Sequence, residues 1–235
     1  MSVSTAPPEI DDVAHRTAAK ERFQRIHRTL RDRICLLEYA PGCYLGAQEL
    51  AREFGTSRTP VRRVLGRLEA EGLIERRHGV GTIVTAFDLR SLEQVYRLRV
   101  ELASLMGRLA PLKCGEQELA LLQSHLARSE DLERHPVPIV FARLNMDFNT
   151  DLFSMIGNAP LREVTERLYY QTTRIWIKSV PAMNFADELA HFERQMFDVI
   201  EALKVGDHGS VGDICRVHIS MSFERMRRHE VVGGN

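Results

Sequence analysis

The sequence contains little that would support secretion, membrane insertion or disulfide chemistry. Its four cysteines, scattered over 235 residues without CxxC spacing, argue against a disulfide framework or a zinc ribbon and fit a reducing cytoplasm. No apolar run approaches the roughly 18 residues of a membrane-spanning helix. The first 15 residues hold acids and prolines in place of the apolar centre of a secretory signal. We therefore expect a cytoplasmic protein without a membrane partner.

The short motifs of common enzymes are also missing. The sequence has no GxSxG, no HExxH, no P-loop and no dinucleotide-binding fingerprint. Gly79-Val80-Gly81 lacks the third glycine of such a fingerprint and lies in an expected hairpin, not before a helix. We expect no catalytic residues and no enzyme activity.

Net charge is zero, but the charge is distributed unevenly along the chain. Residues 21–86 hold 12 Arg against 8 Asp and Glu, which gives +4, whereas residues 87–235 hold 18 Lys and Arg against 21 acids, which gives -3. Every basic residue of the first segment is Arg, the side chain suited to bidentate contacts with phosphate and guanine. A small basic module before a larger acidic one favours DNA binding at one end of the chain.

The first 86 residues divide into a tail and a small mixed module. Residues 1–20 mix serine, threonine, proline and acids without periodicity, so we expect a mobile tail. Residues 21–86 predict a winged helix-turn-helix, in which three helices precede a β-hairpin wing. The helices are expected at 22–37, 47–54 and 57–71, and the strands at 73–77 and 82–84.

Residues 87–235 show a helical pattern throughout, with no strand pattern and no internal repeat. Proline and glycine divide this part into expected helices near 88–110, 115–133, 138–157, 160–180, 185–205 and 207–229. Six helices of this length form a single bundle, with room for a polar pocket in its core. The predicted fold is therefore mainly α, with a winged helix-turn-helix followed by an all-α six-helix bundle.

The helix expected from residue 57 has the features of a recognition helix. Arg58, Thr59 and Arg62 lie near its N-terminal end, the end that enters the major groove in helix-turn-helix proteins. Arg can pair with guanine, and Thr offers both a hydroxyl and a methyl group to base edges. His78 and Gly79 fall at the tip of the hairpin, where a wing can follow the minor groove.

Several motifs of this segment resemble the DNA-binding domain of GntR-superfamily bacterial transcription regulators. They are Pro41-Gly42, Leu50-Ala51, Ser57-Arg58-Thr59-Pro60-Val61-Arg62, Leu68-Glu69 and Glu71-Gly72-Leu73. The resemblance implies DNA contacts at Ser57, Arg58, Thr59, Arg62, His78 and Gly79, and a phosphate contact at Gln48. The family usually has Glu where this chain has Arg63, which adds a positive charge beside the groove.

The helical part resembles the FadR-type ligand-binding domain, also called FCD, in its six-helix form. The resemblance rests on Gly157-Asn158-Ala159-Pro160-Leu161, on the segment from Glu201 to Asp207, on Arg216-Val217-His218 and on Arg99. Many members hold a divalent metal with one Asp and three His, and alignment places these ligands at Asn145, Asn149, Met196 and His218. Carboxamide and thioether groups are poor ligands for such metals, so we expect no metal and no cofactor. The nearby Asp147, Asp151 and His191 are expected to face away from this site.

Two interpretations of these polar side chains remain open. Asn145, Asn149 and His218 either hydrogen-bond to each other as a structural remnant, or line a pocket for an organic effector together with Met196 and Arg99. An inward-facing Arg99 would seek a carboxylate or phosphate, and the resemblance implies organic acids or acyl thioesters as effectors.

The function expected from these features is that of a DNA-binding transcription regulator, a repressor, controlled by a small organic effector. It would act as a homodimer on a near-palindromic double-stranded operator, because one winged helix reads only a few base pairs. One alternative is a constitutive DNA binder whose helical domain, residues 87–235, only dimerises. The other is a metal-dependent enzyme built on the helical bundle.

Overall fold

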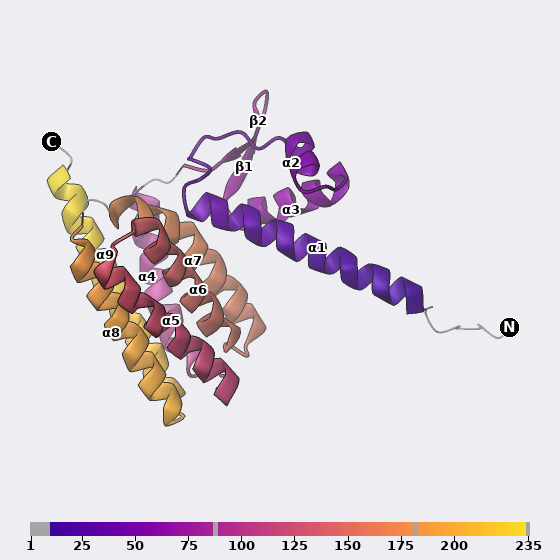
Figure 1. The fold of residues 1–235 in the computed structure, drawn as a ribbon. Helices are drawn as coiled ribbons and strands as arrows, with labels where there is room; N and C mark the ends of the chain where they lie inside the picture. Colours follow the sequence, from indigo (N-terminus) through magenta and orange to yellow (C-terminus); the bar gives the residue numbers. More distant parts are fainter. Residues whose placement is uncertain (1–9, 87–88, 181–182, 234–235) are drawn as a thin grey trace. The chain divides into compact units, whose positions relative to one another are not determined.

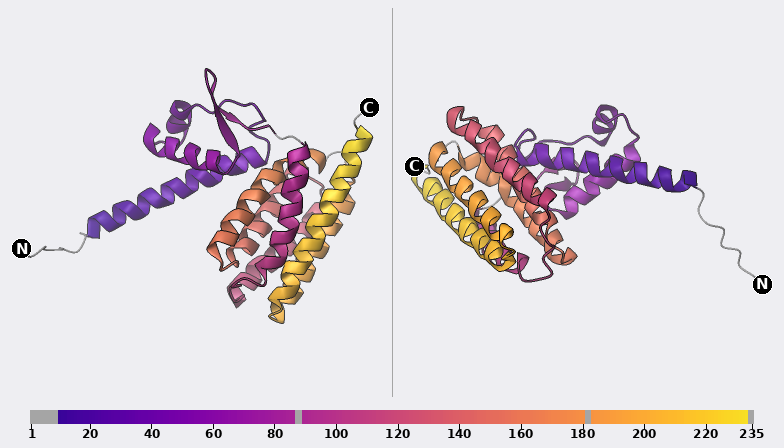
Figure 2. Two further views of the ribbon diagram at one scale, coloured as in Figure 1. Left: turned by 180° about the vertical axis from the view of Figure 1, so that it is seen from behind. Right: turned by 60° about the horizontal axis from the view of Figure 1, so that its bottom comes forward.

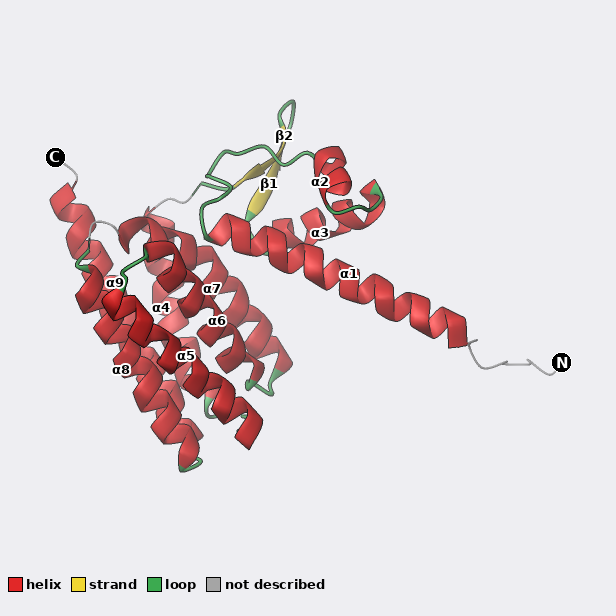
Figure 3. Cartoon of the chain, in the orientation of Figure 1, coloured by secondary structure: helices red, strands yellow, loops and turns green. Residues whose placement is uncertain are grey.

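The computed structural model describes residues 10–86, 89–180 and 183–233. The chain divides into two units, one that ends at Thr85 and one that begins at Ala86, with Cys35–Glu38 grouped with the second. Helices dominate both units, and within the described part of the chain Figure 3 shows strands in one short hairpin alone. The predicted architecture of a winged helix-turn-helix followed by a helical bundle is confirmed.

The N-terminal unit follows the order expected for a winged helix. Its elements are α1 (Ile10–Cys35), α2 (Ala47–Glu53), α3 (Arg58–Ala70), β1 (Ile74–Arg77) and β2 (Gly81–Val84) (Figure 1). The two strands pair antiparallel, with Ile74 opposite Val84 and Arg77 opposite Gly81. Tyr44 adds an isolated bridge to Ile83, so the segment before α2 lies along the open edge of β2.

The expected mobile tail at residues 1–20 is wrong for its second half. Residues 10–20 belong to α1, while residues 1–9 lie outside the part of the chain that the structure describes. The stretch from Ile10 to Lys20 has no proline or glycine and contains three alanines, so intrinsic propensity continues the helix. Helical apolar spacing begins only at Phe23, which is why a periodicity argument missed the earlier turns.

Apolar residues at helical spacing build the core of the N-terminal unit. Ile26, Leu30 and Ile34 of α1 are fully buried, as are Val64 and Leu68 of α3. Burying an aliphatic side chain of this size contributes about 1.5–3 kcal/mol, so this stripe stabilises the unit. It also fixes the rotation of α3 about its own axis, which leaves the polar face of that helix exposed.

Among the residues that the structure describes, the C-terminal unit has six helices, close to the predicted ranges. They are α4 (Leu89–Met106), α5 (Glu116–Arg134), α6 (Pro138–Ser154), α7 (Ala159–Ser179), α8 (Phe185–Lys204) and α9 (His208–Gly233). Two helices have asparagine caps: Asn158 accepts a hydrogen bond from the Leu161 N–H, and Asn184 accepts one from the Ala186 N–H. Helix α4 packs along α9 and also against α7, and Figure 2 shows α4 and α9 side by side.

Aromatic side chains from three helices fill one part of this bundle. The Phe141 ring of α6 meets Trp176 of α7 and Phe192 of α8 edge-on, with centroids 5.3 and 5.8 Å apart. Phe148 adds a further edge-on contact with Phe192, at 5.6 Å. Such pairs add about 0.5–1.5 kcal/mol each beyond their buried area, so they hold α6, α7 and α8 in register. Within the described residues, no helix has the length and apolar character needed to cross a membrane.

Candidate functional site

The first candidate site is the exposed N-terminal end of α3. Gly55 adopts a φ of +59°, which turns the chain between α2 and α3, and Ser57 occupies the N-cap position without a side-chain hydrogen bond. The side chains of Arg58, Thr59 and Arg62 are exposed, and so is Gln48 at the start of α2. These predicted contact residues therefore lie together on the helix-turn-helix, accessible to a duplex.

Electrostatics separates the arginines of this unit into two groups. Arg76 pairs with Glu69 at 3.2 Å and Arg77 pairs with Glu75 at 2.7 Å, so both are neutralised within the unit. No ion pair to Arg58 is found among the described residues, and none to Arg62. Their charge is therefore available to an external anion such as a phosphate or to the acceptor edge of guanine.

Arg63 is held on a different face of α3. Its guanidinium carbon lies 5.7 Å from the ring centroid of Phe23 in α1, a cation–π arrangement. The Phe23 ring in turn stacks on His27, whose Nε2 bonds to Glu71 at 2.8 Å. The exposed guanidinium of Arg63 therefore lies over the Phe23 ring, on the side of the unit formed by α1.

The hairpin tip has the backbone geometry of a tight wing. Gly79 has a φ of +76°, and the Val80 N–H donates to the Arg77 carbonyl at 3.1 Å. His78, Gly79 and Val80 are all exposed. Beside the turn, where β2 begins, a Cβ on Gly81 would lie 2.6 Å from the Tyr44 ring, so only glycine fits there. The predicted wing residues are therefore presented at the end of a fixed two-stranded arm.

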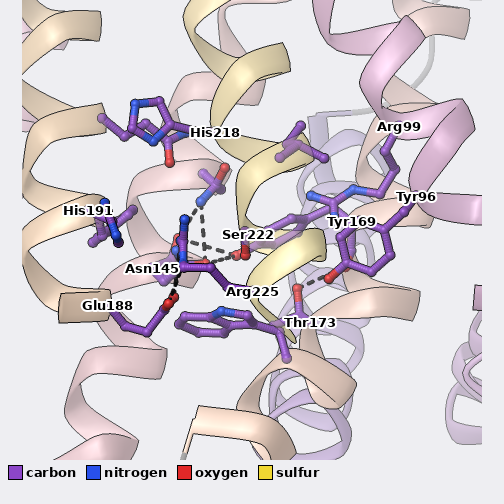
Figure 4. Close-up of a pocket in the computed structure, with 15 residues that line it drawn as sticks. Tyr96, Arg99, Asn145, Tyr169, Thr173, Glu188, His191, His218, Ser222 and Arg225 are labelled. Carbon is purple, nitrogen blue, oxygen red and sulfur yellow. Dashed lines mark hydrogen bonds and ion pairs between the residues drawn. The ribbon is translucent and has the colours of Figure 1, made fainter. Parts of the chain in front are cut away.

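The second candidate site is a pocket inside the helical unit, with a volume of about 600 Å³ including the part open to solvent (Figure 4). Side chains from five helices line it, and four of the five residues predicted for an effector site are among them: Arg99, Asn145, Asn149 and His218. The rest of the lining includes Tyr96, Tyr169, Thr173, Trp176, Glu188, His191, Phe192, Gln195, Ile219, Ser222 and Arg225.

Arg99 is an enclosed cation without a carboxylate partner among the described residues. Its guanidinium lies between the rings of Tyr96 and Tyr169, 5.1 and 5.4 Å from their centroids, and donates to Thr172 Oγ1 at 2.6 Å. Part of its surface faces the open pocket, and protein encloses the rest. This desolvation lowers the pKa of Arg99, although an arginine stays charged at neutral pH. The arrangement favours an anion in the pocket.

Asn145 and Asn149 hydrogen-bond to each other and to a tyrosine. The Tyr169 hydroxyl donates to Asn145 Oδ1 at 2.8 Å, and Asn149 Nδ2 donates to the Asn145 carbonyl oxygen at 2.8 Å. Burial raises the pKa of Tyr169 well above its ordinary value, so the phenol keeps its proton. The network fixes the two amides on one wall of the pocket.

Helices α8 and α9 add a charged pair to the pocket that sequence reasoning missed. Arg225 of α9 pairs with Glu188 of α8, with Nε 2.5 Å from Oε1. His218 of α9 lines the same pocket, and burial lowers its pKa, which favours the neutral ring. A signal for this part of the pocket exists in the sequence, because Ser222 and Arg225 follow His218 at helical spacings of four and seven.

The structure corrects two expectations about α8. Met196 is fully buried and does not line the pocket, whereas His191, expected to face away, does line it. Glu188, His191 and Gln195 form the inward stripe at i, i+3 and i+7, and Met196 lies one residue, about 100° of helix rotation, beyond it.

Asp147 and Asp151 point away from the pocket, as predicted. They bond to Arg128 and His125 of α5 at 3.2 and 2.7 Å.

The donor set does not fit the divalent metal of the related domains. Asn145 Oδ1 is already bonded to Tyr169, Glu188 is bonded to Arg225, and Met196 lies outside the pocket. Among the described residues, no three His, Cys, Asp or Glu side chains converge as a metal site requires.

Comparison with known families assigns both units. Residues 23–84 match the family described as bacterial regulatory proteins, gntR family, and residues 94–221 match the FCD domain. The chain belongs to the gntR family of bacterial regulatory proteins and carries an FCD domain. The two matches coincide with the winged helix and with most of the helical unit.

Individual relatives of this gntR-family chain agree with that assignment. The uncharacterized HTH-type transcriptional regulator YdhC of Bacillus subtilis is 25% identical over 62% of this chain and 66% of its own length. The HTH-type transcriptional repressor RspR of Escherichia coli is 26% identical over 87% of this chain and 89% of its own. The solved structure of E. coli McbR/YncC superposes with a TM-score of 0.74 at 21% identity, covering 89% and 98% of the two chains, and shows the shared fold.

Proposed function

We propose that this protein is a transcription repressor that binds an operator as a homodimer and is controlled by a small organic anion in its helical unit. The observation that carries the proposal is Arg99, an enclosed cation that lines an open pocket and has no carboxylate partner among the described residues. Placing a charge in such surroundings costs free energy unless a counter-charge arrives. An anionic effector supplies that counter-charge.

The DNA-binding half of the proposal is supported by the N-terminal end of α3. Arg58 and Arg62 are exposed and unneutralised there, while other arginines of the unit pair with acids. Base-edge contacts from one such helix cover only a few base pairs, so selectivity requires two copies on two half-sites. The name of the relative RspR supports repression as the direction of control.

The first experiment measures operator recognition. A duplex selected from a random library by the purified protein is titrated by fluorescence anisotropy at fixed salt. Arg58→Ala and Arg62→Ala should each weaken binding by about 1–3 kcal/mol and relax base preference. Arg67→Ala is the matched control, because Arg67 lies on the same helix but pairs with Glu71 at 2.7 Å. Unchanged affinity in both test variants would refute the docking of α3.

The second experiment separates the effector-controlled regulator from the constitutive binder. One observation favours the latter: Asn145, Asn149 and Tyr169 already bond to one another without a ligand. The only tryptophan of the chain, Trp176, lines the pocket, so its fluorescence reports ligand binding directly. A carboxylate that changes this fluorescence and also changes operator affinity supports the regulator. If no acid of a broad panel does either, the helical unit serves dimerisation alone.

A further inference from the structure

A second, mainly apolar chamber lies beside the pocket. Its walls are formed by Leu102, Ala103 and Met106 of α4, Phe153 of α6 and Ile219 of α9, around a volume of about 350 Å³ that includes the part open to solvent. The remaining lining residues include Arg99, Asn149 and Gln195, which also line the pocket. The two spaces therefore share a wall, and Arg99 is part of that wall.

The chamber contains one hydroxyl whose bonding is incomplete. Thr165 of α7 is 8% exposed, and its Oγ1 has no hydrogen-bond partner among the described residues. Thr172 and Thr173 on the same helix each donate to a backbone carbonyl about one turn earlier, at 3.0 and 2.8 Å. Thr165 makes no such bond, and a buried hydroxyl without a partner lowers stability. A ligand atom that forms a hydrogen bond with Thr165 Oγ1 would satisfy this hydroxyl.

Cys215 of α9 also lines the chamber and does not add charge. Burial raises the pKa of its thiol to about 12, so it stays protonated at neutral pH. Arg99 therefore supplies the only formal charge among the residues that line the chamber.

We infer that the effector is an amphipathic carboxylate: its carboxylate pairs with Arg99, its apolar chain enters the chamber between α4 and α7, and a hydrogen-bonding group on that chain meets Thr165 Oγ1. The inference rests on the proposed function and narrows its ligand. An acyl thioester fits less well, because its acyl end carries no charge for Arg99. A small dicarboxylate also fits less well, because a second charge would enter an apolar space.

The test uses the full-length protein and two series of probes. Straight-chain monocarboxylates from four to eight carbons, and their terminally hydroxylated counterparts, are titrated against Trp176 fluorescence and checked by calorimetry. Each methylene that enters the chamber should strengthen binding about three- to fourfold, since burying one is worth about 0.8 kcal/mol. Affinity should stop rising once the chamber is full.

Two variants test whether the apolar chain of the ligand occupies the chamber. Ala103→Leu fills the chamber and should abolish the dependence on chain length. Thr165→Val should weaken the hydroxylated acid that reaches it about tenfold, leave the parent acids unchanged, and leave the melting temperature unchanged or raised. Thr173→Val is the matched control and should lower the melting temperature, because that hydroxyl donates to the Tyr169 carbonyl. Should Ala103→Leu fail to fold, the Thr165→Val comparison still decides the matter.

The outcomes separate this inference from the proposed function. If acids bind and need Arg99, but their affinity is independent of chain length, the proposed effector control is supported. The inference about the chamber is then wrong, because no part of the ligand enters it. Equal affinities in wild type and Thr165→Val for every hydroxylated acid would also overturn the inference, since the hydroxyl would then meet water only. If no acid binds at all, the proposed effector control itself fails.

Discussion

Replacing Arg99 by methionine should remove effector binding at little cost to folding. Methionine keeps the length and the apolar stem of the side chain between Tyr96 and Tyr169 but carries no charge. This is unlike most substitutions in a packed bundle, which remove contacts and lower stability.

The stabilising interactions lost with the guanidinium add up to about 2.5–7 kcal/mol. Two cation–π contacts contribute about 0.5–2 kcal/mol each, and the charged hydrogen bond to Thr172 about 1.5–3 kcal/mol. The gain is the desolvation cost of the guanidinium, which amounts to several kcal/mol for a buried ion. Thr172 is not left unsatisfied, because its hydroxyl also bonds to the carbonyls of Leu168 and Tyr169. The free energy of unfolding should therefore change by less than about 1.5 kcal/mol.

The assay is urea unfolding followed by Trp176 fluorescence, which reports the helical unit because the chain has no other tryptophan. Carboxylate binding should fall at least tenfold in Arg99→Met, since one charge-assisted bond is worth about 1.5–3 kcal/mol. Arg99→Lys is the control that keeps the charge. A loss of more than about 3 kcal/mol in the methionine variant would show that Arg99 is a structural ion, and the reasoning would be refuted.

Three further predictions address other parts of the chain. Gly66→Ala in α3 should stabilise the N-terminal unit by about 0.5–1 kcal/mol, because the nearest atom to the new Cβ is 4.0 Å away. Gly107→Ala should instead destabilise the helical unit, because its Cβ would lie 1.6 Å from a backbone oxygen at the start of α9. Calorimetric melting distinguishes these two outcomes. Because the pKa of His218 lies below its ordinary 6.5, the free energy of unfolding should fall as pH drops below 6.5 through that lowered value, and His218→Gln should flatten this profile. Glu188→Gln should cost about 1–3 kcal/mol by leaving Arg225 without its carboxylate partner, and a second change, Arg225→Met, should restore part of the loss; no restoration would contradict the pairing.

The N-terminal unit was predictable because its signals are local. Buried Val61, Val64, Leu65 and Leu68 recur at the spacing of one helix face, so the sequence determines which face of α3 is exposed. The turn before this helix follows from Gly55, whose positive φ suits glycine. The early turns of α1 were missed because propensity, and not an apolar stripe, maintains them.

Sequence alone determined the number of helices in the C-terminal unit and their approximate ends, since proline, glycine and asparagine act on the backbone next to them. It also supplied the polar residues from which the pocket is made. Only the tertiary structure decided that His191 and not Met196 lines the pocket, and that two tyrosines enclose Arg99. The reason is that packing against neighbouring helices sets the rotation of each helix, and a shift of one residue turns a side chain by about 100°.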